Sequence, residues 1–268
     1  MTDLALYDIA LLQTAALVDL SSPEAKQRSA LKLRDTFLRL LAHHPTEVVF
    51  EIGANEASFS QAARRRAKEA EVIAFEANPH VWERFKDRCA RAGVDYQHLA
   101  VTEITGPVTF QLQTSRSGKP VPLTTGSNSL LKRVDHEATY SPVEVPGMRL
   151  DEFIATRGLG GRSVCAWIDV EGAIRQVLTG MGDRIDDVHM MLIEVENAPK
   201  WEGQWCWHDV LAYLRPRGFV PVLRDFEYTG QFNVLFLREE MLRELRVRII
   251  VAEHLSALGR PDPDSAAD

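Results

Sequence analysis

The feature that most constrains this chain is residues 48–60, an apolar run followed by a glycine turn and the start of a helix. The next apolar run, residues 71–76, ends in an acid, Glu76. In a β-turn-α-β unit of this kind, the glycine lets the backbone approach a ligand, helix amides face that ligand, and the acid can grip ribose hydroxyls. Gly53 stands alone instead of in a G-x-G-x-x-G motif, so the turn lacks the glycines that let the backbone approach a pyrophosphate. S-adenosylmethionine, which has a ribose but no phosphate, is the better fit for this unit.

After this unit, strand-like and helical segments continue to alternate. The runs at residues 163–169 and 188–195 are almost continuously apolar, as a parallel sheet buried on both faces requires. The predicted fold class is therefore α/β, with a doubly wound and mostly parallel sheet. Other strands are expected at residues 94–99, 219–223 and 232–237, the last two as an antiparallel pair, and helices at residues 57–69, 80–92, 173–180 and 208–216.

The chain is expected to divide into three parts: an N-terminal helical cover at residues 1–45, a cofactor-binding domain at residues 46–238, and a C-terminal helix with an acidic tail at residues 239–268. In the cover, a helix is expected at residues 3–20. A second helix is expected to begin at Ser21, with Glu24 completing a capping box. These helices can serve as a packed lid or as a homodimer contact, and both interpretations stay open.

Residues 104–150 interrupt the alternation of strands and helices. They contain a strand-like run at residues 108–112 and an extended piece at residues 143–146, and Asp151 is expected to cap a short helix. A long excursion with weak periodicity inside an α/β domain is usually functional or mobile. We expect a β-rich insertion beside the mouth of the cofactor site.

Composition excludes several classes of protein. A chain of 268 residues that is 45% apolar can bury one substantial core. The formal net charge is -7, with acids and bases interspersed, which argues against a nucleic-acid partner. The three cysteines form no C-x-x-C pair, which is typical of a reducing compartment. Because no signal peptide is visible and no apolar run approaches the roughly 20 residues of a membrane span, we expect a cytoplasmic protein.

Four short motifs resemble the FkbM family of S-adenosylmethionine-dependent methyltransferases. In chain order they are residues 51–55 (Glu-Ile-Gly-Ala-Asn), 75–79 (Phe-Glu-Ala-Asn-Pro), 126–130 (Gly-Ser-Asn-Ser-Leu) and 168–172 (Ile-Asp-Val-Glu-Gly). The resemblance implies a class I (Rossmann-like) methyltransferase fold and, most often, methylation of a hydroxyl on a sugar or another natural-product intermediate. The sequence departs from the family pattern at Glu51, where aspartate is usual, and at Ala57, where glycine is frequent.

The resemblance also implies which residues hold the cofactor. Glu51, Gly53 and Asn55 are expected to contact the methionine part, and Glu76 the ribose. A carboxylate that faces two vicinal hydroxyls can accept two charge-assisted hydrogen bonds, so an acid suits this position. The remaining cofactor candidates are Ala77, Asn78, Ala100, Val101, Ser129 and Asp169, of which Ala100 and Val101 are expected beside the adenine or in the core.

Acids gather at the ends of the fourth and fifth predicted strands. Asp169 and Glu171 follow one strand, and Glu194 and Glu196 follow its neighbour with the same spacing. Four carboxylates at one mouth repel each other unless a proton, a cation or a sulfonium shares the site. We expect the sulfonium to supply the charge and no metal to be required. The alternative is Mg²⁺, whose ligands would be Asp169, Glu194, Glu196 and Asn197.

Candidates for catalysis and for acceptor binding follow from position. Asp169 is the first choice for the base that removes a hydroxyl proton. The other catalytic candidates are Glu171 and His208. Trp201 and Trp205 belong to a tryptophan-rich segment that can stack on sugar rings or anchor its loop to the core. Acceptor contacts are expected from Ser127, Asn128, Glu194, Trp201 and Trp205.

The predicted activity is methyl transfer to a small-molecule or saccharide acceptor. Two alternatives remain, N-methylation of a small molecule and a catalytically silent cofactor-binding partner subunit. A nicotinamide-linked oxidoreductase is disfavoured because the phosphate-binding glycines are missing.

Overall fold

The computed structural model describes residue 9 and residues 11–258. Of the helix expected at residues 3–20, residues 11–15 are helical, while residues 1–8 and 10 lie outside the described part of the chain. The acidic tail from residue 260 onward also lies outside it. No described helix is long and apolar enough to cross a membrane.

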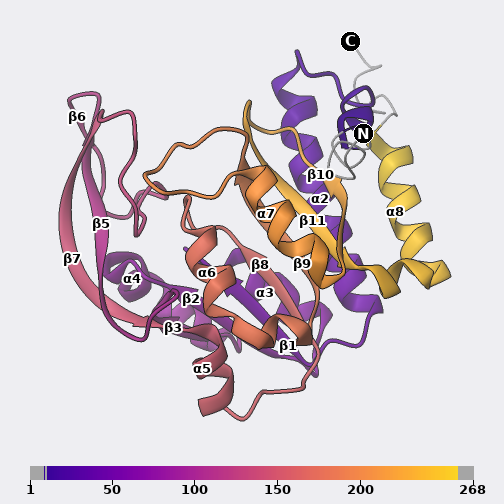
Figure 1. Ribbon diagram of the computed structural model, residues 1–268, viewed down its shortest axis with the longest axis horizontal. Helices are drawn as coiled ribbons and strands as arrows, with labels where there is room; N and C mark the ends of the chain where they lie inside the picture. Colours follow the sequence, from indigo (N-terminus) through magenta and orange to yellow (C-terminus); the bar gives the residue numbers. More distant parts are fainter. Residues whose placement is uncertain (1–8, 10, 259–268) are drawn as a thin grey trace.

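A seven-stranded sheet forms the centre of the molecule. Its order is β10-β11-β9-β8-β1-β2-β3; β11 runs antiparallel to both of its neighbours, β10 and β9, while the strands from β9 to β3 are parallel (Figure 1). The α/β, doubly wound and mostly parallel sheet expected for a class I methyltransferase is therefore confirmed. The strands are β1 (Val48–Ile52), β2 (Glu71–Glu76), β3 (Asp95–His98), β8 (Val164–Ile168), β9 (Val188–Glu196), β10 (Phe219–Arg224) and β11 (Gln231–Arg238).

Helices cover both faces of the sheet. In β1, Val48, Phe50 and Ile52 pack into one hydrophobic core and Val49 into the other, as the two-residue period of a strand dictates. The first face carries α5 (Leu150–Thr156), α6 (Ile174–Gly180) and α7 (Trp207–Leu214), and the second α2 (Pro23–His43), α3 (Ser58–Arg66), α4 (Pro79–Arg91) and α8 (Leu245–Leu258). Short 3₁₀ turns lie at Gly182–Asp187, Arg215–Arg217 and Glu239–Arg243.

The insertion forms a second, four-stranded sheet. Its order is β4-β7-β5-β6, and a long antiparallel pairing of β5 with β7 makes the hairpin at the left edge of Figure 1. Both long strands extend beyond the expected runs because many of their side chains are polar and face solvent, which hides the hydrophobic pattern. The strands are β4 (Ala100–Val101), β5 (Gly106–Arg116), β6 (Lys119–Pro120) and β7 (Ala138–Met148).

Three predicted helix starts are wrong by one or a few residues. Ser22 and not Ser21 caps α2, since its hydroxyl accepts the Ala25 amide at 3.1 Å. Asp151 lies in the first turn of α5 and pairs with Arg149 instead of capping the helix. The last helix, expected to start at residue 239, is preceded by a 3₁₀ turn and begins at residue 245.

Helix α2 is tied to the C-terminal part of the chain. Thr36 contacts the buried His254 of α8, with Oγ1 and Nδ1 at 2.8 Å. The Ser29 hydroxyl accepts the backbone N–H of Phe226, in the loop between β10 and β11, at 2.9 Å. The N-terminal helix is thus part of the packed body of the molecule, and the homodimer contact stays a prediction.

Candidate active site

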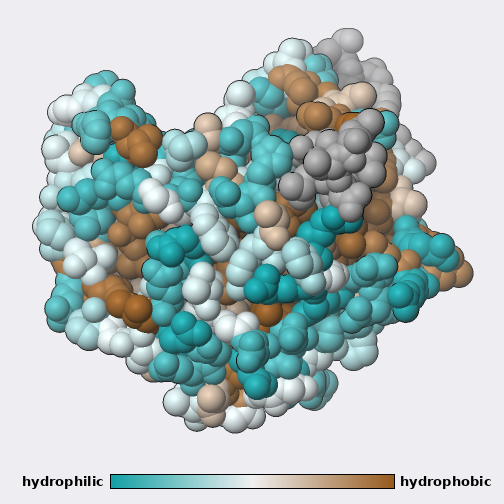
Figure 2. All heavy atoms as spheres, in the orientation of Figure 1, coloured by the Kyte–Doolittle hydropathy of each residue, from teal (hydrophilic) through white to brown (hydrophobic). Residues whose placement is uncertain are grey.

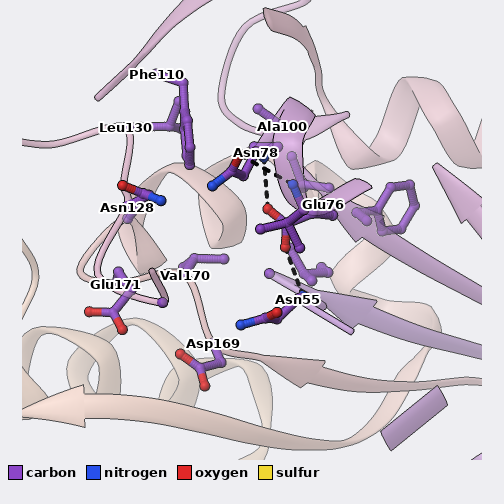
Figure 3. A pocket seen from close by; sticks show the side chains of 18 of the residues that line it. Asn55, Glu76, Asn78, Ala100, Phe110, Asn128, Leu130, Asp169, Val170 and Glu171 are labelled. Atoms are coloured by element: carbon purple, nitrogen blue, oxygen red, sulfur yellow. Dashed lines mark hydrogen bonds between the residues drawn. The ribbon is translucent and has the colours of Figure 1, made fainter. Parts of the chain in front are cut away.

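A cavity lies at the carboxyl ends of β1, β2 and β8. This is where the strand order reverses, the position at which doubly wound sheets bind ligands. The cavity encloses about 760 Å³, including its open mouth. Its lining comes from the β1–α3 turn, the end of β2, the insertion and the β8–α6 turn (Figure 3).

The turn after β1 requires a glycine. Gly53 has a φ of +78°, and a Cβ built on it would lie 1.7 Å from the Asp169 carbonyl oxygen. The Asp169 amide also donates to the Ile52 carbonyl at 2.9 Å. The end of β8 therefore packs directly against the turn. Ala57 also has a left-handed backbone, with a φ of 53°, which explains physically why glycine suits its position.

Glu76 lies in the middle of the cavity wall. Its side chain is 8% exposed, and its two oxygens accept the backbone N–H groups of Asn55 and Asn78, each at 2.7 Å (Figure 3). Burial raises the pKa of Glu76 to about 7, against the opposing effect of these two amides. An ionised carboxylate has about four lone-pair sites, so both oxygens retain acceptor capacity for ligand hydroxyls.

One end of the cavity is apolar. Ala100, Phe110 and Leu130 face it beyond Glu76, while Asp169 and Glu171 lie at the opposite end (Figure 3). Phe110 and Leu130 come from the insertion and were not among the predicted site residues, because the sequence did not reveal the register of β5. The predicted candidates Gly53, Asn55, Glu76, Ala77, Asn78, Ala100, Val101, Asn128 and Asp169 all line this cavity.

Two asparagines connect the insertion to the rest of the cavity wall. The side-chain amides of Asn78 and Asn128 both donate to the Leu123 carbonyl, at 2.7 and 2.8 Å. The Asn128 oxygen in turn accepts the Gln113 amide of β5 at 2.7 Å. These bonds hold the loop before Asn128 against the start of α4 and close one side of the cavity.

Two predicted cofactor contacts lie outside the lining. The Glu51 carboxylate accepts the Ser60 amide at 2.7 Å and so holds the start of α3 against β1. Its side chain therefore points toward α3, and its expected contact with the methionine part stays a prediction. The Ser129 hydroxyl donates to the Glu171 carbonyl at 2.7 Å. Both residues position other parts of the site.

Three carboxylates meet where the cavity ends. Asp169, Glu171 and Glu194 offer oxygens that all lie within 4.8 Å of one another. Burial raises the pKa of each carboxyl above its usual range, and the negative charge of Asp169 adds to the effect on Glu171 and Glu194. Gln231 donates from Nε2 to Glu194 at 2.6 Å. Among the described residues, the structure records no ion pair for these three acids, so a cationic ligand group would relieve their repulsion.

The turn that carries Glu171 is held from two sides. Glu171 and Gly172 both have positive φ, 50° and 86°. A Cβ on Gly172 would lie 2.8 Å from the Trp201 ring, and the Arg133 guanidinium lies 4.8 Å from the ring centroid of Trp201. Trp201 is only 1% exposed. Its indole packs on the turn, which agrees with the loop-anchoring alternative instead of stacking on a sugar.

A second cavity begins on the other side of the same carboxylates. It encloses about 1160 Å³, including its open mouth, and Asp169 and Glu171 line it as well as the first cavity. Figure 2 shows the surface hollowed between the β5–β7 hairpin and the shoulder formed by α2. Other lining residues are Leu31, Arg34, Ser127, Glu194, Trp201, Asp225 and Tyr228.

Known proteins that resemble this chain include methyltransferases. The family profile of the methyltransferase FkbM domain matches residues 51–221. The chain belongs to the FkbM methyltransferase family. The 2-O-methyltransferase NoeI of Sinorhizobium fredii is 24% identical over 217 residues, which cover 77% of this chain and 83% of that protein. This FkbM protein is an S-adenosylmethionine-dependent methyltransferase.

Solved structures of methyltransferases resemble it at low identity. The FkbM methyltransferase from Methylobacillus flagellatus KT has a TM-score of 0.45 and 12% identity, covering 72% of this chain and 43% of that one. Magnesium protoporphyrin IX methyltransferase from Synechocystis PCC 6803, solved with bound S-adenosylmethionine, has a TM-score of 0.44 and 10% identity, covering 81% of this chain and 83% of that one.

Several predicted site residues of the FkbM protein lie away from both cavities. His208 is exposed on α7, and Trp205 packs against Tyr213, with ring centroids 5.2 Å apart. Their predicted catalytic and acceptor roles are corrected, because α7 turns onto the face of the sheet and not toward the strand ends. Glu196 is buried and accepts a hydrogen bond from Gln204.

The predicted metal ligands are not brought together. Asn197 is exposed and Glu196 faces Gln204, so neither joins Asp169 and Glu194. Within the described part of the chain, the one group of acids close enough to hold an ion includes Glu171 instead. These carboxylates equally suit a sulfonium, and neither the family nor the relatives support Mg²⁺.

Proposed function

We propose that this FkbM methyltransferase moves the methyl group of S-adenosylmethionine to a hydroxyl of a saccharide or another polyhydroxylated small molecule, with Asp169 as the base. One observation carries the proposal. Asp169 lines the first cavity and the second, so it lies where a cofactor in one would meet an acceptor in the other.

The first cavity suits the cofactor from end to end. The adenine would lie between Ala100, Phe110 and Leu130, and the ribose hydroxyls would donate to Glu76. The sulfonium would then face Asp169 and Glu171, whose pKa values are raised mainly by burial. The positive charge of the cofactor lowers the cost of ionising them.

The chemistry is an in-line displacement. The acceptor oxygen forms a bond to the methyl carbon, the bond from carbon to sulfur breaks, and the hydroxyl proton passes to the Asp169 carboxylate. Alignment supplies much of the rate and proton removal a further part. Glu194, held by Gln231, lies close enough to share the accepted proton with Asp169.

The second cavity suits a polar acceptor. Ser127, Arg34, Glu194 and Asp225 present hydroxyl, guanidinium and carboxylate groups to it. Side chains of this kind recognise an acceptor with several hydroxyls. The printed name of the relative NoeI, a 2-O-methyltransferase, supports oxygen as the acceptor atom.

Asp169→Asn tests the proposal, because asparagine keeps the shape but cannot take a proton. Turnover should fall roughly 10²–10⁴-fold, while affinity for S-adenosylhomocysteine and the thermal midpoint change far less. All three quantities are measured on one preparation, with Asp186→Asn, an exposed aspartate, as the matched control. A folded Asn variant with near-normal turnover, or methylation only at nitrogen, would contradict the proposal.

A further inference from the structure

The rim of the second cavity is made by residues outside the segment that matches the FkbM family. Leu31 of α2 and Tyr228 of the β10–β11 loop both line this cavity, and they are 59% and 60% exposed. The family match covers residues 51–221 and so includes neither. A large aliphatic and a large aromatic side chain therefore flank the mouth of a cavity whose floor is carboxylate.

This rim is built before any ligand arrives. The Ser29 hydroxyl accepts the Phe226 amide at 2.9 Å, which fastens α2 to the loop. The loop is braced by Asp225, whose two oxygens accept the backbone and side-chain N–H groups of Asn233 at 3.0 and 2.8 Å. Because Ser29 is buried and Asn233 half-buried, these bonds fix the backbone of α2 and of the loop next to Leu31 and Tyr228, which lowers the ordering needed on binding.

Rim and floor are parts of one site. The charge of Glu227 raises the pKa of the Tyr228 hydroxyl, and the floor residues Glu194 and Glu171 add to this effect. Tyr228 therefore lies within electrostatic reach of the floor. Without its open mouth the cavity holds about 470 Å³, within the roughly 300–1,000 Å³ of small-molecule sites.

We propose that Leu31 and Tyr228 bind a second ring of the acceptor, so that the acceptor is a glycoside of at least two rings. This inference rests on the proposed function. The ring that carries the reacting hydroxyl lies on the carboxylate floor, and the apolar C–H face of the next ring packs on the Tyr228 ring and the Leu31 side chain. Tyrosine suits this place because it offers a broad apolar face with a polar edge.

The test uses matched acceptors of one and two rings. Methyl glycosides of common hexoses are compared with disaccharides that have the same hexose at the non-reducing end, by transfer from labelled S-adenosylmethionine. In the native protein, kcat/KM should be higher for the disaccharide. Tyr228→Ala should lower the ratio of the disaccharide value to the methyl-glycoside value roughly three- to tenfold, Tyr228→Phe should preserve it, and Leu31→Ala should lower it less.

Leu245→Ala is the matched control, since Leu245 is 65% exposed on α8 and lines neither cavity. Binding of S-adenosylhomocysteine establishes that each variant is folded. An unchanged ratio in Tyr228→Ala, or methyl glycosides that serve the native protein as well as disaccharides, would overturn the second-ring site while leaving the proposed function intact. Absence of transfer to any saccharide hydroxyl would also overturn the second-ring site, and absence of transfer to any hydroxyl acceptor would overturn the proposed function as well.

Discussion

The two cavities of this methyltransferase are built in opposite ways. On the cofactor side, the polar groups already have protein partners, as the two backbone amides on Glu76 and the shared Leu123 carbonyl show. Where the acceptor cavity meets it, Asp169, Glu171 and Glu194 also have raised pKa values, but no backbone amide among the described residues is recorded as a donor to their carboxylates.

The origin of the walls differs as well. The lining of the cofactor cavity lies entirely within residues 51–221, the segment that matches the family, whereas α2 and the β10–β11 loop contribute to the acceptor cavity. The cavity proposed for the cofactor is thus lined by the shared domain, whereas the cavity proposed for the acceptor also takes residues from the parts added around it. Changes on one side should therefore leave the other largely intact.

The largest expected effect is a loss of stability. It follows from disturbing the close contact between the β1–α3 turn and the end of β8. In Gly53→Ala the new methyl group would collide with the Asp169 carbonyl, in a left-handed backbone that alanine already disfavours. The free energy of unfolding should fall by roughly 3–5 kcal/mol, the sum of the left-handed and overpacking costs. Denaturant titration measures it.

Gly161 supplies the control for that change. It has nearly the same φ, +77°, but no atom lies within 4 Å of a Cβ built there. Gly161→Ala should cost only about 1–2 kcal/mol. Equal losses in the two variants would show that the close approach of β8 to the turn contributes nothing.

Glu76→Gln tests whether the first cavity binds the cofactor. Affinity for S-adenosylhomocysteine should fall by roughly 1.5–3 kcal/mol, the scale of hydrogen bonds to a charged group, or about 10- to 150-fold. Calorimetry gives the affinity, and KM for the acceptor should change little.

The matched control is Glu51→Gln. Glu51 is equally buried, has a pKa that burial also raises to about 7, and accepts one backbone amide at the same 2.7 Å, yet it lies outside the cavity. It should lose stability but keep the affinity of the folded protein. An equal loss of affinity in both variants would support the direct contact that the sequence predicted for Glu51.

Stability should also depend on pH in a definite direction. The pKa values of Glu51, Glu76 and Glu196 are raised to about 7 by burial, so the folded protein keeps protons that the unfolded chain has lost. The free energy of unfolding therefore falls as pH rises from about 4.5 to above 7, by up to roughly 3 kcal/mol for each of these groups. Calorimetric scans should show a lower Tm at pH 8 than at pH 5.5, and Glu51→Gln should reduce the difference.

The smallest expected effect concerns metal. Because the sulfonium supplies a positive charge to Asp169 and Glu171, treatment with EDTA should leave most of the turnover intact. The assay is methyl transfer before and after chelation, with Mg²⁺ added back. Activity that the chelator abolishes and Mg²⁺ restores would assign the three carboxylates to an ion instead.

Sequence alone predicted the cofactor side far better than the acceptor side. The strand ends at Glu76 and Asp169 were predictable because apolar runs mark buried parallel strands, and ligands lie beyond their carboxyl ends. Glu51 belongs to the same motif as Gly53, but alternation along β1 turns its side chain toward α3 and out of the cavity lining.

The second cavity was predicted only in part. Ser127, Glu194 and Trp201 were predicted acceptor contacts and do line it, whereas Leu31 and Tyr228 join its lining only through tertiary packing between the two ends of the chain, which no local pattern encodes. His208 and Trp205 were placed in the site by their position after β9, but chain proximity does not reveal the face onto which α7 folds. Phe110 and Leu130 depended on the register of the hairpin, which its polar residues conceal.

The bond between Ser29 and Phe226 also bears on how the molecule assembles. These residues lie 197 positions apart, and β1 at the centre of the sheet pairs with β8, which is made long after it. During synthesis, β1 to β3 and the hairpin leave the ribosome first, with one edge of β1 still unpaired and open to wrong partners. The wall of the second cavity that α2 and the β10–β11 loop form cannot be completed until Phe226 packs against α2. A chain that ends before residue 226 therefore lacks this wall, together with β11 and α8.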